Sequence, residues 1–369
     1  MTREEGSLKY FYSHAAVPGD RAVIQHVERA GAKLHDALRR TDPKALSLSE
    51  YNQHYLSRYL GNLRSVVQRT TYLFACSVAK YSLADLPGLV FVEYGGGTGL
   101  LALLAKAAGL GNVIYNDIYD VSCRDAERLA RAIGLGAEHY VEGDIDALVD
   151  YVRRHGLQTD VVASCNVIEH VYDVDHFLTR VSDLSSARLS VVASSDANQD
   201  NPVVKRALVR AQLRLEASDR SPTWGFKERD SLRAYVNIRR SILADAAPGL
   251  SPNELDDLAR STRGLSESDI RKCAAQYVAT GAIDYRPDHP TNTCDPLTGN
   301  WAEHLMDPGI LRQKLAVRGF DARVLAGYYG SSKNPARAAA ARSLNLMIRA
   351  TGPFATKLAP YYVLQGHRS

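Results

Sequence analysis

The stretch Leu89-Val90-Phe91-Val92-Glu93-Tyr94-Gly95-Gly96-Gly97-Thr98-Gly99 decides the predicted fold. Its first half is a short apolar run, its second half is rich in glycine, and the composition of residues 100–108 favours a helix. Glycine lets a backbone turn sharply and approach a ligand closely. The start of the following helix offers free N–H groups and the positive end of a dipole. The stretch therefore predicts a strand, a ligand-binding turn and a helix.

Strands and helices alternate after this turn. Further strands are predicted at residues 112–117, 139–144, 161–166 and 189–194, and a second helix is predicted at residues 123–133. Alternation at this spacing predicts a doubly wound, mostly parallel sheet. Strand signals return at 320–325 and 361–365, which completes a seven-stranded, Rossmann-like α/β fold.

The pattern divides the chain into four predicted segments. Residues 1–85 form a helical N-terminal cap, residues 86–195 the α/β core, residues 196–305 a helical insertion, and residues 306–369 the return to the sheet with a basic helix. Long insertions into a sheet domain usually carry function. Within the N-terminal cap, a stripe at helical spacing is predicted to face the core. It consists of Tyr51, Tyr55, Tyr59, Leu63 and Val67.

Polar side chains follow the ends of the first four predicted strands, beginning with Glu93, Asp117 and Asp144. An acid at Glu93 suits a positively charged ligand group better than a pyrophosphate. An acid at the end of the second strand, as at Asp117, can accept hydrogen bonds from ribose hydroxyls. Asp144 can accept an adenine amino proton while Ile145 covers the ring. These groups converge at the carboxyl edge of one sheet, where such folds bind ligands.

At these residues the chain resembles the class I S-adenosylmethionine-dependent methyltransferases. The run V-E-Y-G-G-G-T-G resembles the first motif of the family, and the G-D-I at 143–145 and the C-N-V-I-E-H-V-Y-D at 165–173 resemble later ones. The resemblance covers about residues 88–195, 318–327 and 360–366. It implies S-adenosylmethionine as methyl donor and S-adenosylhomocysteine as product. The residues expected at the cofactor are Glu93, Tyr94, Gly95, Gly97, Gly99, Asp117, Ile118, Asp144, Ile145, Asn166 and Val167.

Glu169 and His170 leave the fourth strand toward the expected reaction centre. Methyl transfer to a hydroxyl requires that a proton be removed, and histidine suits this role because imidazole titrates near neutrality. The run Glu169–Asp173 also resembles that of quinone-pathway O-methyltransferases, whose acids and histidine near this point can hold a divalent metal. We interpret His170 and Glu169 as catalytic residues and assign no metal ligand. His176 lies further along, on a predicted helix.

A second polar cluster lies at the end of the insertion. It contains Asp288, His289, Asn292, Cys294, Asp295, Asn300, Trp301, Glu303 and His304. Such a group can line a polar acceptor pocket in which Trp301 stacks on a ring. We therefore predict that the insertion is an acceptor-binding lid, and that His304 takes part in catalysis.

Two regions of the chain are basic. Residues 203–240 hold two lysines and eight arginines against four acids, which fits either a solvated helix face or recognition of an anionic acceptor. Residues 322–369 contain no Asp or Glu. Their basic helix either packs between the last two strands or lies peripherally on an anionic membrane.

The bulk composition narrows the function classes. The 369 residues carry a formal net charge of only +4, which does not suggest a dedicated nucleic-acid binder. The five cysteines form no C-x-x-C pair, the N-terminus does not resemble a secretory signal, and no long apolar run occurs, so we expect a cytoplasmic protein.

The sequence therefore predicts O-methylation of a small-molecule or glycan (sugar-like) acceptor. One alternative is an RNA-modifying methyltransferase or RNA-binding protein that uses the basic region 203–240, although we expect no specific nucleic-acid partner. A second alternative is a dinucleotide-dependent oxidoreductase, against which Glu93 and Asp144 argue. An oligomer is possible.

Overall fold

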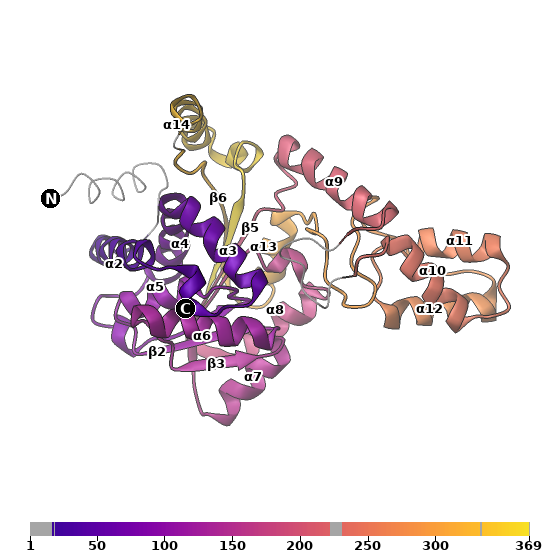
Figure 1. The fold of residues 1–369 in the computed structure, drawn as a ribbon, viewed down its shortest axis with the longest axis horizontal. Helices are drawn as coiled ribbons and strands as arrows, with labels where there is room; N and C mark the ends of the chain where they lie inside the picture. Colours follow the sequence, from indigo (N-terminus) through magenta and orange to yellow (C-terminus); the bar gives the residue numbers. More distant parts are fainter. Residues whose placement is uncertain (1–16, 18, 222–230, 333, 369) are drawn as a thin grey trace. The chain divides into compact units, whose positions relative to one another are not determined.

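The computed structural model describes residues 17, 19–221, 231–332 and 334–368 (Figure 1). They divide into two compact units. Unit 1 comprises Met1–Ile168, Asp175–Ser195 and Asp307–Ser369, and unit 2 comprises Glu169–Val174 and Asp196–Met306.

Unit 1 is built on a seven-stranded sheet of order β3-β2-β1-β4-β5-β7-β6. The strands are β1 Val90–Tyr94, β2 Asn112–Asp117, β3 His139–Glu142, β4 Thr159–Cys165, β5 Ser185–Ser195, β6 Asp321–Ala326 and β7 Tyr362–His367. The first five strands pair in parallel, and β7 is antiparallel to both β5 and β6. The predicted Rossmann-like α/β fold is confirmed, and its mostly parallel sheet carries one antiparallel hairpin.

Helices follow the strands as the alternation predicts. In unit 1 they are α5 Leu100–Ala107, α6 Asp120–Ile133, α7 Ile145–Arg154, α8 Val174–Asp183 (whose first residue belongs to unit 2), α13 Pro308–Ala316 and α14 Pro335–Ala350. The apolar strands β1 and β2 are almost wholly buried, as expected for parallel strands covered on both faces. Phe91, Val113 and Leu104 lie in one core with Val27 and Leu73 of the N-terminal helices.

Among the described residues, three α-helices precede the sheet: α2 Arg21–Arg39, α3 Glu50–Gly61 and α4 Leu63–Val78. The predicted tyrosine stripe is wrong for Tyr51 and Tyr55, because α3 buries Asn52 and Leu56 instead, whereas Tyr59 packs against the core. Tyr51, Tyr55 and Tyr59 are half-buried and contact one another edge-on or tilted. Leu63 and Val67, which follow the end of α3 and belong to α4, do lie in the core.

Unit 2 is helical, with α9 Pro202–Ala217, α10 Tyr235–Ala246, α11 Pro252–Ser261 and α12 Glu267–Thr280. Its apolar core includes Ile238, Leu243, Leu258 and Ile270. Arg239 of α10 is fully buried and pairs with Glu216 of α9, so it is not part of the basic surface that the sequence suggested for 203–240. Lys227, Glu228, Arg229 and Asp230 of that region lie outside the described residues.

Candidate cofactor and catalytic sites

The glycine turn after β1 has the backbone that the sequence predicted. Gly95 has φ +66°, and a Cβ there would lie 2.6 Å from a methyl carbon of Val167. Only glycine avoids both the strain and the clash. Gly97 has φ +55°, but a Cβ on it would meet no atom within 4 Å. The backbone of Gly97 therefore faces open space, where a ligand can approach it. Gly99 caps the start of α5.

Asp117 ties the end of β2 to this turn. Its carboxylate is buried and accepts hydrogen bonds from the N–H of Gly97 at 2.9 Å and of Tyr119 at 3.0 Å. A carboxylate can accept about four hydrogen bonds, so Asp117 can still accept hydrogen bonds from ribose hydroxyl groups. Ile118, the next residue, is 43% exposed. Its position suits contact with an apolar ring.

Glu93 has partners that the sequence did not indicate. Its buried carboxylate accepts hydrogen bonds from the N–H groups of Leu101 (3.1 Å) and Ala102 (2.8 Å), in the first turn of α5. Burial raises the pKa of Glu93 to about 8 despite these two bonds. Both side-chain oxygens are therefore occupied by amides at the start of α5. Its predicted contact with a ligand cation stays a prediction.

Asp144 and Ile145 begin α7 at the end of β3. Asp144 is exposed, and one of its oxygens accepts from the N–H groups of Asp146 and Ala147, both at 3.1 Å. Ile145 is buried. Asp144 is therefore the N-cap residue of α7, and its predicted hydrogen bond with an adenine amino group stays a prediction.

Asn166 leaves β4 with φ +57°, a strained value for a residue with a side chain. The guanidinium of Arg69, on α4, donates to its Oδ1 at 2.9 Å, and Arg69 also lies over the ring of Tyr361 at 4.2 Å. No local pattern marks Arg69, because it lies 97 positions before Asn166 in the chain.

In unit 2, His170 makes two contacts that define its chemistry. Its Nδ1 lies 2.8 Å from the carbonyl oxygen of Trp301, and its Nε2 lies 3.9 Å from a carboxylate oxygen of Glu303. The imidazole is half-exposed. Glu303 has φ +56°, so the loop holds this acid in a strained backbone conformation.

Glu169 is fully buried, and neither carboxylate oxygen has a hydrogen-bond partner among the described residues. Burial raises its pKa to about 7, opposed by the neighbouring His170 and assisted by Glu303. A buried acid without partners is costly to ionise, and such groups concentrate at functional sites.

His304 stacks on Trp301, with ring centroids 4.0 Å apart, and its backbone N–H donates to the carbonyl of Glu169. Burial lowers the pKa of His304 to about 4, so its ring is neutral at physiological pH. Trp301 also donates its Nε1–H to the carbonyl of Tyr172. The rings of Trp301 therefore already contact protein side chains.

The rest of the predicted 288–304 cluster serves mainly to hold its own loop. Asn292, Cys294 and Asp295 are buried. The side chain of Asn292 forms hydrogen bonds with the backbone of Leu305, and that of Asp295 accepts hydrogen bonds from Ser231. The prediction that these three line an acceptor pocket is therefore not supported by their contacts. Asp288 is exposed, and His289 contacts Thr291.

Gln212 of α9 is a residue that the sequence did not single out. It is fully buried, and its side-chain amide donates to the carbonyls of Ala302 (3.3 Å) and Glu303 (2.9 Å). It therefore fixes the loop that carries Glu303 and His304. An isolated glutamine inside a basic helix carries no sequence signal for this role.

Comparison with known proteins identifies part of the chain. Residues 92–185 match the family model described as "Methyltransferase domain". These residues form a class I S-adenosylmethionine-dependent methyltransferase domain. The matched segment runs from β1 to the start of β5 and includes the glycine turn, Asp117 and Asn166. No curated protein matches the chain.

Several solved structures are similar to the chain. One is an S-adenosylmethionine-dependent methyltransferase from Mesorhizobium loti, with 16% identity over 77% of this chain and 93% of that one, at a TM-score of 0.34. Another, from Archaeoglobus fulgidus, shows 15% identity over 77% and 89%, also at 0.34. A hypothetical protein of Thermus thermophilus is matched over only 65% of its length and 30% of this chain, with 16% identity and a TM-score of 0.27. At such values the similarity carries no information about substrate.

The residues of the methyltransferase domain fit its cofactor. Gly97 presents its backbone to open space, Asp117 is fixed beside it, and the exposed Ile118 follows.

His176 lies on α8 as predicted, and its Nε2 forms a hydrogen bond with Asp146 at 2.8 Å. Among the described residues, no group of three or more His, Cys, Asp or Glu side chains is placed to hold a metal ion. Within the same residues, every helix is too short or too polar to span a bilayer.

Proposed function

We propose that this chain transfers a methyl group from S-adenosylmethionine to an oxygen atom of a small-molecule or sugar-like acceptor. The observation that carries the donor half is the bond from the Gly97 amide to Asp117, which fixes the glycine turn beside a buried acid at the carboxyl edge of the sheet. The observation that carries the oxygen acceptor is the His170–Trp301 contact.

The chemistry assigned to His170 follows from this contact. When bound, the cofactor supplies a methyl carbon whose bond to sulfur breaks, with the electron pair left on sulfur, as its bond to the acceptor oxygen forms. Trp301 offers a carbonyl, which can only accept, so Nδ1 of His170 holds the ring proton and Nε2 keeps its lone pair. Nε2 takes the acceptor's hydroxyl proton, and the Glu303 carboxylate stabilises the resulting imidazolium.

Glu169 has a separate role in the proposal. Its side chain is fully buried and does not touch the acceptor, so Glu169 acts as a positioning residue: its backbone carbonyl accepts from the N–H of His304 and ties that loop to the neighbour of His170. His304 is kept neutral by burial and contributes a flat apolar face rather than a charge.

The test follows an isotopic label. The protein is incubated with methyl-¹³C S-adenosylmethionine and either the small-molecule extract or the RNA fraction of its source cells. We expect new ¹³C-methyl NMR signals in the small-molecule fraction, at shifts of carbon bonded to oxygen. Labelled N-methyl or C-methyl products would contradict the O-methyl assignment.

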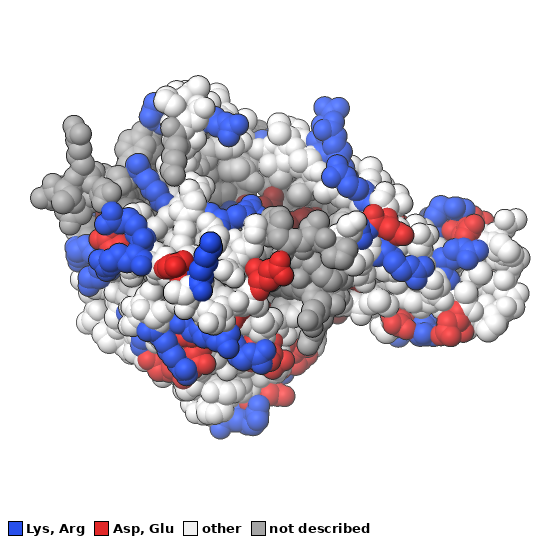
Figure 2. Space-filling view, in the orientation of Figure 1, with Lys and Arg blue, Asp and Glu red and all other residues white. Residues whose placement is uncertain are grey.

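One surface favours the RNA alternative. Lys205, Arg206, Arg210 and Arg214 are all exposed on α9, and the three arginines recur every four residues. Figure 2 shows this run of basic side chains. This basic surface comprises fewer residues than the sequence suggested for 203–240, because Arg240 pairs with Asp256 and Arg220 donates to the carbonyl of Ser231. Label in the RNA fraction, together with RNA binding that weakens steeply with salt, would establish this alternative.

A further inference from the structure

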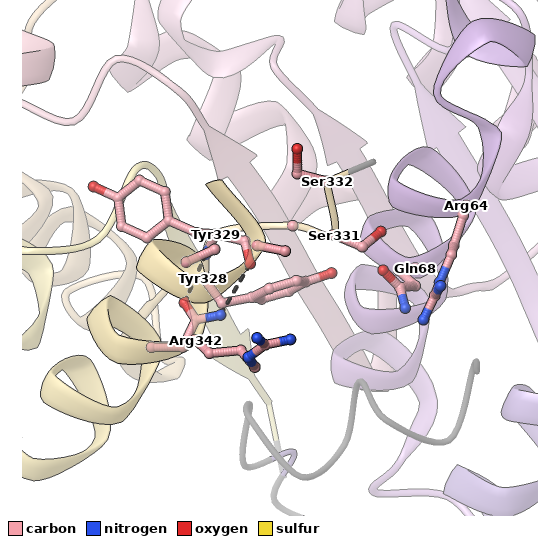
Figure 3. Close-up of a pocket in the computed structure, with 11 residues that line it drawn as sticks. Arg64, Gln68, Tyr328, Tyr329, Ser331, Ser332 and Arg342 are labelled. Carbon is pink, nitrogen blue, oxygen red and sulfur yellow. Dashed lines mark hydrogen bonds between the residues drawn. The ribbon is translucent and has the colours of Figure 1, made fainter. Parts of the chain in front are cut away.

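A pocket of about 160 Å³ lies in unit 1, apart from the glycine turn (Figure 3). Its walls come from α4, from the loop after β6 and from α14. Figure 3 shows Arg342 of α14 on one side, Arg64 and Gln68 of α4 on the other, and the ring of Tyr328 between them. Ser331 and Ser332 complete the rim.

The lining of this pocket suits an anion. Two guanidinium groups from different helices meet serine hydroxyls and a glutamine amide, and no Asp or Glu is among the described residues that line it. Guanidinium groups bind phosphate through paired N–H donors. The sequence reinforces this, since residues 322–369 contain no acid.

Contacts of Asn345 and Gly330 hold the loop of this pocket in shape. Asn345 of α14 accepts from the N–H of Tyr329 at 2.8 Å and donates to the carbonyl of Tyr329 at 2.9 Å. Gly330 packs so closely on α4 that a Cβ would lie 2.2 Å from the hydroxyl oxygen of Ser65. The loop is therefore fixed between the two helices, and a ligand need not order it.

The pocket lies on the side of the sheet that carries the methyltransferase motifs. Both β5 and β6 are antiparallel to β7, so the loop after β6 emerges at the same edge as the ends of the parallel strands. Gln68 in the pocket is followed by Arg69, which bonds Asn166 at the exit of β4. The ring of Tyr361 lies under Arg69 and 5.8 Å from the ring of Tyr328.

We infer that this pocket binds a phosphate group of the methyl acceptor, between Arg64 and Arg342. A cavity of this size holds a ligand of about six heavy atoms, as a cavity of similar volume holds benzene. It therefore takes a phosphate with a few attached atoms rather than a whole nucleotide. The inference rests on the proposed function, because it names the class of acceptor: a phosphorylated small molecule, or the phosphate of a lipid-linked one.

Calorimetry with the full chain tests this at the level of binding. The probes are inorganic phosphate, glycerol 3-phosphate, and vesicles of phosphatidylglycerol or of phosphatidylcholine. We expect both soluble phosphates to bind, and Arg342→Gln and Arg64→Gln each to weaken that binding at least about tenfold, as for loss of one charge-assisted hydrogen bond. Arg337→Gln is the matched control: Arg337 is exposed on α14 and does not line the pocket.

The outcomes separate the claims. An equal loss in Arg337→Gln would show diffuse attraction to a basic helix and overturn the inference. Binding of phosphatidylglycerol vesicles without binding of soluble phosphates would replace the subsite by a membrane-docking surface, to which the exposed Leu346 and Phe354 would contribute. S-adenosylhomocysteine should bind all variants equally. If it binds and phosphate does not, only this inference fails; if it does not bind the unaltered protein, the proposed function fails.

Discussion

The Nδ1 atom of His170 lies 2.8 Å from the carbonyl oxygen of Trp301, and this contact sets the tautomer of the imidazole. The geometry is that of a general base oriented by a neighbour, although the neighbour is a carbonyl rather than a carboxylate. The loop that contains Trp301 is held by the side chain of Gln212, which donates a hydrogen bond to the carbonyl of Ala302. The orientation of His170 thus depends on a helix distant in sequence.

Replacing His170 tests its role as base. His170→Ala should lower kcat for the labelled acceptor by about 10²- to 10⁴-fold, the usual contribution of general base catalysis. Its affinity for S-adenosylhomocysteine should not change. His155→Ala, at an exposed histidine after α7, is the control and should leave kcat unaltered. Full activity of His170→Ala would rule out the assignment.

The buried Glu169 makes stability depend on pH. Burial raises its pKa from 4.5 to about 7, so the folded state retains a proton that the unfolded state has released. The contribution of Glu169 to the free energy of unfolding is therefore greatest below pH 4.5 and is lost as the pH rises to about 7. Glu169→Gln removes this loss. Its free energy of unfolding should exceed that of the unaltered protein by a margin that grows by roughly 1–3 kcal/mol over that interval.

Urea denaturation at several pH values measures this margin. Glu50→Gln, at an exposed glutamate, serves as control and should follow the unaltered protein. Parallel curves for Glu169→Gln and the unaltered protein would mean that Glu169 has a charged partner in the folded state.

The ion pair between Arg239 and Glu216 should behave unlike its exposed neighbour on the same helix. Glu216→Leu leaves a fully buried guanidinium without its carboxylate and should cost about 3–5 kcal/mol of stability. Asp256→Asn breaks the half-exposed pair with Arg240 and should cost less than about 1 kcal/mol. The double variant Glu216→Leu with Arg239→Leu should recover most of the loss. Thermal denaturation ranks the three, and equal losses for both single variants would contradict the burial argument.

Alanine variants of Gly97 and Gly134 distinguish the effect of backbone strain from that of contact with the ligand. Both have positive φ, and a Cβ on either meets no atom within 4 Å. Each glycine-to-alanine variant should therefore lose about 1–2 kcal/mol of stability. Only Gly97→Ala should also weaken binding of S-adenosylhomocysteine, because its new methyl group enters the space assigned to the ligand. Equal ligand affinity in both variants would move the cofactor away from Gly97.

The parallel part of the fold follows from local patterns. β2 spans the predicted residues 112–117, and the glycines of the first turn have the positive φ angles that their spacing implied. Strand ends shift by a few residues elsewhere; β5, for example, begins at Ser185 rather than at residue 189. These ends depend on pairing with neighbouring strands, which the chain's own periodicity does not contain.

The partners of the site residues could not be predicted in the same way. Glu93 was expected to face a ligand cation, yet the amides of α5 lie against it. Arg69 and Gln212 reach the sites across 97 and 90 or more positions, so no local spacing marks them. Residue types near a turn indicate the chemistry present, whereas the assignment of each side chain to ligand or scaffold depends on tertiary packing.

The most direct test of the central claim is calorimetric titration with S-adenosylhomocysteine and, separately, with NADH. We predict saturable binding of S-adenosylhomocysteine, none of NADH, and weakened binding in Asp117→Asn, because Asp117 both holds Gly97 and is assigned to the ribose. Saturable binding of NADH without binding of S-adenosylhomocysteine would contradict the account.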